Sequence, residues 1–140
     1  MLYAALSRAG AFAETFLRTP GRTLLDPALV ARKAFAGIEL RDALTLIELH
    51  GPGAAALGAT AELTHGPLPY DLAQAWSKAL HGHPIAADGL AYRARHNDDE
   101  ICVALFDRAA ARVAVVHRDA NLDAGWFYDL ALLHGIGIAP

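Results

Sequence analysis

Cysteine and serine are scarce in this sequence of 140 residues, which limits the disulfides and the nucleophilic sites that it can form. The single cysteine, Cys102, has no second thiol with which to form an intramolecular disulfide. It lies in the apolar run 101–106, and apolar surroundings raise the pKa of a thiol and make it inert, so we interpret it as a buried strand residue. The two serines, Ser7 and Ser77, lie outside any GxSxG motif, which excludes the nucleophile elbow of α/β-hydrolases.

The chain also lacks an excess of positive charge. Twelve Lys and Arg residues stand against fifteen Asp and Glu residues, which gives a net charge of −3 and a pI near 6.1. Nucleic-acid binding depends on dense Lys and Arg, because these side chains contact the phosphates. The composition therefore gives no reason to expect direct contact with nucleic acid.

Long apolar runs are absent as well. No stretch approaches the roughly 18 consecutive apolar residues that span a bilayer, and the start Met1-Leu2-Tyr3 lacks the basic and apolar regions of a signal peptide. We therefore expect a cytoplasmic protein with no membrane partner. With 54% hydrophobic and 19% charged residues, the chain has the composition of a folded protein, and its length fits one domain over residues 1–140.

Four segments show the apolar spacing or the end signals of helices. They are residues 8–18, 26–35, 68–82 and 122–133. Ser7 is a candidate N-cap of the first helix. Asp26-Pro27 opens the second helix, which Gly37 closes. The third helix is opened by Leu68-Pro69-Tyr70-Asp71 and ended by Gly82.

Six apolar segments bounded by turn signals are predicted strands. They are residues 1–5, 38–40, 43–49, 88–92, 101–106 and 111–117. Arg41-Asp42 is the predicted turn between the second and third strands. The polar turn 93–100 and the residues 107–110 separate the last three strands, and these connections are too short for parallel crossovers, so we expect an antiparallel meander. The predicted fold class is α+β, with a small mixed or antiparallel sheet and flanking helices.

Seven histidines invite a metal interpretation, most of all at His81-Gly82-His83. No carboxylate or cysteine stands at a ligand-like spacing beside this pair, and a histidine in the last turn of a helix interacts favourably with the helix dipole without a metal. We expect no metal site. The segments Gly51-Pro52-Gly53 and Gly135-Ile136-Gly137 match neither of the glycine-rich phosphate-binding patterns.

Glu14 lies on the first predicted helix, away from the apolar stripe of that helix. It is therefore placed to face a cleft beside the first strand. A plainer interpretation stays open, because Glu14 and Arg18 are four residues apart and would form a surface ion pair on a helix.

Two arginines flank Ala94 at the end of a predicted strand. Arg93 and Arg95 share one face if the strand continues, and Ala94 then points to the other. Arg95, beside His96-Asn97, suits a phosphate-bearing ligand, because a guanidinium group binds phosphate oxygens through two hydrogen bonds. The alternative is that these are solvated turn residues with no ligand.

Several short segments, taken in order, resemble the RES-domain family. They are Leu2-Tyr3 followed by a helix bearing Glu14, then Tyr70…Gln74-Ala75-Trp76, Asp88-Gly89…Tyr92-x-x-Arg95 and Ala104-Leu105-Phe106-Asp107-Arg108. The resemblance extends over nearly the whole sequence. It implies a fold similar to that of ADP-ribosyltransferases and the activity of an NAD-consuming toxin that an Xre-type antitoxin holds in check.

The resemblance also implies roles for single residues. Glu14 falls at the family glutamate and is the expected catalytic residue. Tyr3, Tyr92 and Arg95 are expected to bind NAD, which is the substrate. The family serine falls on Ala94, and the arginine that normally precedes the Leu-Tyr strand has no counterpart in this sequence, so we expect a RES domain without the family's N-terminal segment.

Two functions of different classes follow from the resemblance. The first is a toxin domain of a bacterial toxin–antitoxin system that cleaves the nicotinamide–ribose bond of NAD by hydrolysis, phosphorolysis or ADP-ribosyl transfer, with Arg8 or Arg93 as substitutes for the absent arginine. The alternative is a degenerate, non-catalytic RES domain that binds a protein partner. Whether the chain is an enzyme, and whether it forms an oligomer, stays open here. A third option, a domain unrelated to NAD, is expected if Glu14, Tyr3 and Arg95 do not share one pocket.

Overall fold

Helices and strands alternate irregularly along the chain, and the predicted α+β class is confirmed. The computed structural model describes residues 1–66 and 69–140. The strands are β1 (Leu2–Ala5), β2 (Leu24–Leu25), β3 (Phe35–Leu40), β4 (Leu46–Glu48), β5 (Gly89–Ala94), β6 (Asn97–Leu105), β7 (Val113–Asp119) and β8 (Gly137–Ile138). The helices are α1 (Arg8–Phe16), α2 (Pro27–Ala31), α3 (Gly51–Ala56), α4 (Glu62–His65), α5 (Asp71–His81), the 3₁₀ helix η1 (Asp107–Arg112) and α6 (Gly125–Leu133).

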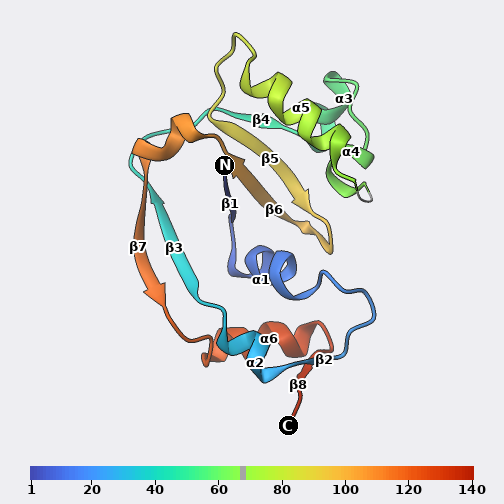
Figure 1. Cartoon of the computed structure of the whole chain (residues 1–140), viewed down its shortest axis with the longest axis vertical. Coiled ribbons are helices and arrows are strands. Elements are labelled where there is room, and N and C mark those ends of the chain that lie inside the picture. Colours follow the sequence, from blue (N-terminus) through green and yellow to red (C-terminus); the bar gives the residue numbers. More distant parts are fainter. Residues whose placement is uncertain (67–68) are drawn as a thin grey trace.

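The central sheet has the strand order β1-β6-β5-β4 (Figure 1). Strands β1 and β5 both run antiparallel to β6, whereas β4 runs parallel to β5. The register sets Tyr3 opposite Ala104 and Tyr92 opposite Cys102. Because side chains alternate along a strand, these four residues point to the same face of the sheet. Residues of α1 and α5 pack on this face.

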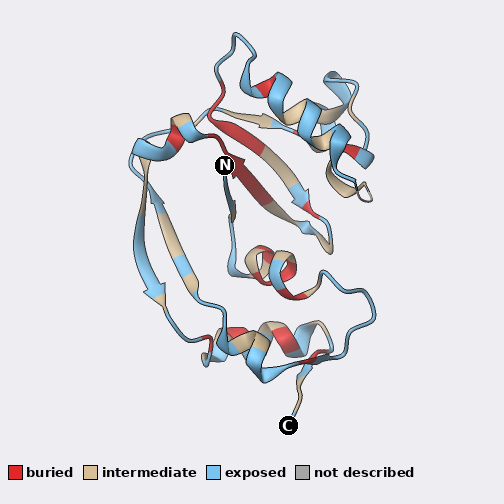
Figure 2. Cartoon of the chain, viewed as in Figure 1, coloured by how far each residue is buried: buried red, intermediate tan, exposed pale blue. Residues whose placement is uncertain are grey.

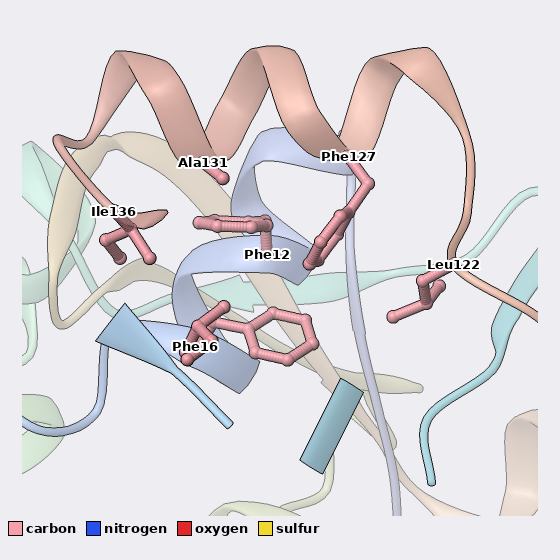
Figure 3. Close-up of a cluster of buried hydrophobic side chains, with 7 residues drawn as sticks. Phe12, Phe16, Leu122, Phe127, Ala131 and Ile136 are labelled. Carbon is pink, nitrogen blue, oxygen red and sulfur yellow. The ribbon is translucent and has the colours of Figure 1, made fainter. Parts of the chain in front are cut away.

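Helix α1 packs against α6 in the lower part of the molecule (Figure 1). The apolar cluster between them consists of Phe12, Phe16, Leu25, Leu122, Phe127, Ala131 and Ile136. Figure 3 shows Phe12 and Phe16 of α1 meeting Phe127 of α6, and their ring centroids lie 5.6 and 5.3 Å from that of Phe127. This packing fixes which side of α1 is left to face the sheet.

A second apolar cluster lies between α5 and the central sheet. Its buried members are Leu49, Leu63, Leu80, Leu90, Ala104 and Phe106. The buried stretches of β5 and β6 that support it are red in Figure 2. The cluster anchors α5 through Leu80, so the other faces of the helix are free to line a cavity or meet solvent.

Three of the four predicted helices are confirmed as α1, α5 and α6. The Oγ atom of Ser7 accepts a hydrogen bond from the backbone N–H of Gly10 at 2.9 Å, so Ser7 is the N-cap of α1 as predicted. Helix α5 begins at Asp71 and ends at the C-cap Gly82. The predicted opening residue Leu68 lies outside the described residues.

The second predicted helix was too long. Asp26 and Pro27 open α2 as expected, but α2 ends at Ala31 instead of about Phe35. Phe35 and Gly37 belong to β3, where they pair with Asp119 and His117 of β7. Pairing with a strand more than 70 residues away overrides the local helical pattern, which single-sequence reasoning does not detect.

The prediction of an antiparallel meander over the last three long strands is only half right. Strands β5 and β6 form a hairpin, and its turn is two residues long, at Arg95 and His96, instead of the predicted 93–100. Strand β7 does not join them but pairs with β3 in a separate two-stranded ribbon (Figure 1). The predicted turn at Arg41-Asp42 therefore connects strands of different sheets.

Buried Asp88 explains why the chain leaves the central sheet after β6. Its side chain is nearly buried and accepts hydrogen bonds from the backbone N–H of Thr45 at 2.8 Å and from the guanidinium group of Arg112. Its backbone carbonyl accepts a hydrogen bond from the N–H of Phe106 at 2.8 Å. These bonds hold η1 against the ends of β5 and β6, so β7 starts beyond the sheet.

Candidate functional site

A pocket of about 1070 Å³ lies between α1, α5 and one face of the central sheet. All four residues that the resemblance assigns to the site line it, namely Tyr3, Glu14, Tyr92 and Arg95. They come from β1, α1, β5 and the turn after β5. Its volume lies slightly above the usual range for ligand pockets, which is about 300–1,000 Å³. The condition for a domain unrelated to NAD, that these residues fail to share a pocket, is not met.

Glu14 connects α1 to the β5–β6 hairpin. Its Oε1 atom accepts a hydrogen bond from the backbone N–H of Arg95 at 3.1 Å. Among residues 1–66 and 69–140, Glu14 forms no ion pair with Arg18, so the plain surface-pair interpretation is wrong. One carboxylate oxygen is thus engaged by the turn, while the residue lines the pocket.

Two tyrosines contribute different surfaces to the pocket. The side chain of Tyr92 is half-buried, and burial, followed by the nearby Cys102 and Glu14, raises the pKa of its hydroxyl. This hydroxyl stays protonated at neutral pH and is able to donate a hydrogen bond. Tyr3 is 67% exposed, so its ring forms an open wall on which a planar group can stack.

The charge of the pocket differs in sign from that of the whole chain. Its described lining residues include one carboxylate, Glu14, and three permanent cations, Arg18, Lys78 and Arg95. His96 also lines it, and burial together with Arg95 lowers the pKa of its imidazole, so His96 is neutral at neutral pH. A positive pocket on a chain of net charge −3 attracts an anionic ligand such as a phosphate ester.

The RES-domain model matches residues 1–127. The chain belongs to the RES-domain family. This family comprises NAD-degrading toxins of toxin–antitoxin systems, and membership implies NAD as the substrate and an antitoxin as the partner. No curated protein and no solved structure matches the chain.

Ala94, which the sequence analysis expected at the position of the family serine, does not line the pocket of this RES domain. It is 0% exposed and packs with Ala13 and Cys102 in a small apolar cluster under α1. Cys102 is 1% exposed, which confirms it as a buried strand residue, and burial raises the pKa of its thiol to about 11. A hydroxyl at position 94 would therefore enter an apolar interior.

Arg8 and Arg93, which the sequence analysis named as substitutes for a family arginine, are engaged elsewhere in this RES domain. The guanidinium carbon of Arg8 lies 5.4 Å from the ring centroid of Trp126, and Arg93 donates a hydrogen bond to the backbone carbonyl of Asp98. Neither of these arginines lines the pocket. The cations that do so beside Arg95 are Arg18 and Lys78, which the sequence analysis did not select.

The sequence contains one signal for the pocket wall that α5 forms, which the sequence analysis did not select. Polar residues recur along α5 at helical spacing, and they line the pocket: Gln74, Ser77, Lys78 and His81.

Among the described residues, no group of three or more His, Cys, Asp or Glu side chains is placed to hold a metal ion. No helix within residues 1–66 and 69–140 is long and apolar enough to cross a bilayer.

Proposed function

We propose that this RES domain is the toxin of a bacterial toxin–antitoxin system and cleaves the nicotinamide–ribose bond of NAD. The observation that carries the proposal is the meeting of Tyr3, Glu14, Tyr92 and Arg95 in one positively charged pocket. A dinucleotide has two phosphates, a cationic nicotinamide ring and sugar hydroxyls. The pocket offers cations, one carboxylate, an aromatic wall and a hydroxyl donor, so each part of the ligand has a complementary group.

The reaction breaks the bond between the ribose C1′ and the nicotinamide nitrogen. The electron pair of that bond goes to the ring, which leaves as neutral nicotinamide, and positive charge develops on C1′ and the ring oxygen. The Glu14 carboxylate stabilises this charge and orients the ribose hydroxyls. An acceptor then forms a bond to C1′ and loses its proton; the acceptor is water, phosphate or a protein side chain.

Binding and positioning fall to the other pocket residues. Stacking on Tyr3 holds the nicotinamide ring, and the Tyr92 hydroxyl donates to the ribose or to a phosphate. Arg95 and Arg18 hold the phosphates at the Glu14 end of the pocket, since charge-assisted hydrogen bonds are about twice as strong as neutral ones. In this proposal Arg18 is the second cation that holds the phosphates.

The burial of Ala94 supports an active domain and not a degenerate one. Because position 94 does not line the pocket, the absent serine hydroxyl removes no group from the lining. We further propose that the partner is an Xre-type antitoxin and that the protein acts in the cytoplasm, where both NAD and the antitoxin are present.

The test is expression of the chain in bacteria without an antitoxin, with cellular NAD and growth followed after induction. Wild type is expected to deplete NAD and stop growth. Glu14→Gln, which keeps an oxygen acceptor for the Arg95 N–H, is expected to leave both unchanged. Glu39→Gln, at an exposed position on β3, is the matched control and should behave as wild type. Unchanged NAD in cells that contain folded wild-type protein would favour the non-catalytic binding module.

A further inference from the structure

His81 lies in the last turn of α5 and lines the pocket, and its ring is held by two contacts although it is partly exposed. Its Nε2 atom lies 3.0 Å from Oδ1 of Asp107, although the two side chains are 45% and 82% exposed. Its ring meets that of Phe106 edge-on, with centroids 4.9 Å apart and planes at 90°. The backbone carbonyl of His81 also accepts a hydrogen bond from the guanidinium group of Arg108.

These contacts orient the ring more than they stabilise the fold. An exposed ion pair contributes little to stability. Phe106 is buried in the cluster beneath α5, so the surface against which His81 packs is rigid. The guanidinium carbon of Arg108 lies 5.7 Å from the centroid of the Phe106 ring. This contact holds the start of η1 beside the last turn of α5. These contacts hold the imidazole of His81 at a constant position on the pocket wall.

The hydrogen-bond partner of the His81 Nε2 atom determines whether Nδ1 of the same ring donates or accepts a hydrogen bond. The hydrogen bond from His81 lowers the pKa of the Asp107 carboxyl, so Asp107 is an ionised acceptor and Nε2 carries the donated proton. In the neutral imidazole Nδ1 is then an acceptor. Within the described part of the chain, Nδ1 of His81 has no hydrogen-bond partner. A ligand with an N–H donor at this place would supply one.

The position of His81 along the sheet indicates which part of a dinucleotide it meets. Glu14 lies near Tyr92 and Cys102, whose hydroxyl and thiol pKa values it raises. Phe106, beneath His81, is four residues further along the chain than Cys102, which at about 3.3 Å per residue corresponds to roughly 13 Å. A ligand whose scissile bond lies at Glu14 reaches His81 only with its far end. In NAD that end is the adenosine half.

We propose that His81 is a specificity-determining residue that recognises the adenine base, its Nδ1 accepting a hydrogen bond from the 6-amino group, and that Asp107 is the positioning residue that fixes the ring. This inference rests on the proposed function. Hypoxanthine carries a carbonyl in place of that amino group, so it sets an acceptor against an acceptor. A site with a fixed polar group rejects a ligand that leaves the group unpaired.

The test compares NAD with nicotinamide hypoxanthine dinucleotide, by kcat/KM for nicotinamide release and by calorimetric binding. The wild-type chain is expected to prefer NAD by about tenfold or more. His81→Phe keeps a ring against Phe106 and is expected to bring the two dinucleotides within about twofold of each other. Asp107→Asn, which leaves His81 in place without its ionised partner, should give an intermediate preference.

His117→Phe is the matched control, because His117 also pairs with a carboxylate, Asp119 at 2.9 Å, but on β7 and away from the pocket. It should keep the wild-type preference. Equal use of both dinucleotides by wild type, or an unchanged preference in His81→Phe, would overturn the inference and leave the proposed function standing. If wild type neither binds nor cleaves either dinucleotide, the proposed function fails and the inference falls with it.

Discussion

Ala94→Ser, which introduces a serine where the resemblance expects one, is expected to weaken the fold without raising the proposed NAD-cleaving activity. Ala94 is 0% exposed and packs among Ala13 and Cys102, with Tyr92 at the edge of the cluster. A hydroxyl buried there without a partner costs about 1–2 kcal/mol. Since position 94 does not line the pocket, we expect kcat/KM for NAD to change by less than about threefold.

Urea unfolding followed by circular dichroism measures the first effect. A loss of that size shifts the midpoint by roughly 0.5–1 M urea. Ala36→Ser, at an exposed site on β3, is the control and should change stability by less than about 0.5 kcal/mol. Our reasoning about position 94 would be refuted if Ala94→Ser left stability unchanged and raised kcat/KM tenfold or more, because the hydroxyl would then have to reach the pocket.

Three further predictions concern the buried pair, the thiol and the phosphate contacts. Asp88→Ala leaves Arg112 without its buried partner and should lower the free energy of unfolding, measured in urea, by about 3 kcal/mol. This is the low end of the range for buried pairs, because the Arg112 side chain is 31% exposed. Asp119→Ala breaks an exposed pair, and a loss in Asp88→Ala no larger than in Asp119→Ala would contradict the prediction. Stability should fall as the pH rises from about 9 to about 11. The reason is that the Cys102 thiol loses its proton near its ordinary pKa of 9.0 in the unfolded chain, whereas burial raises its pKa to about 11 in the folded chain. The same alkaline loss in a Cys102→Ala variant would argue against this cause. Arg95→Ala should weaken calorimetric binding of ADP-ribose roughly 10- to 100-fold, whereas Arg32→Ala, exposed after α2 and outside the pocket, should bind as wild type does.

Elements with local signals were predictable from the sequence. Ser7 marks the start of α1 because its side chain caps that helix directly. The β5–β6 hairpin is equally local, since its turn spans only two residues. The partner of β7 was not predictable in this way, because β3 is far away in the chain and the buried bonds of Asp88 determine where the intervening η1 lies. Phe35 was assigned to a helix for the same reason.

In the candidate site, too, the residues with a local sequence signal were predictable and those that depend on tertiary packing were not. Glu14 was separated from the core by helical phase, but its hydrogen bond to Arg95 joins segments 81 residues apart and has no local signal. Tyr3 and Tyr92 were selected by family resemblance alone. Arg18, Lys78 and His81 were not selected as site residues, since their role depends on how α1 and α5 pack on one face of the sheet. The polar spacing on α5 was visible, yet it is typical of any solvated helix face.

The most direct test of the central claim is release of nicotinamide from NAD by the purified chain, followed over time with and without phosphate, beside Glu14→Gln and Glu39→Gln. The account predicts release by wild type and Glu39→Gln, and none by Glu14→Gln. A rate in phosphate above that in its absence would identify phosphate as an acceptor. No release by folded wild-type protein, or equal release by Glu14→Gln, would contradict the claim that this pocket cleaves NAD.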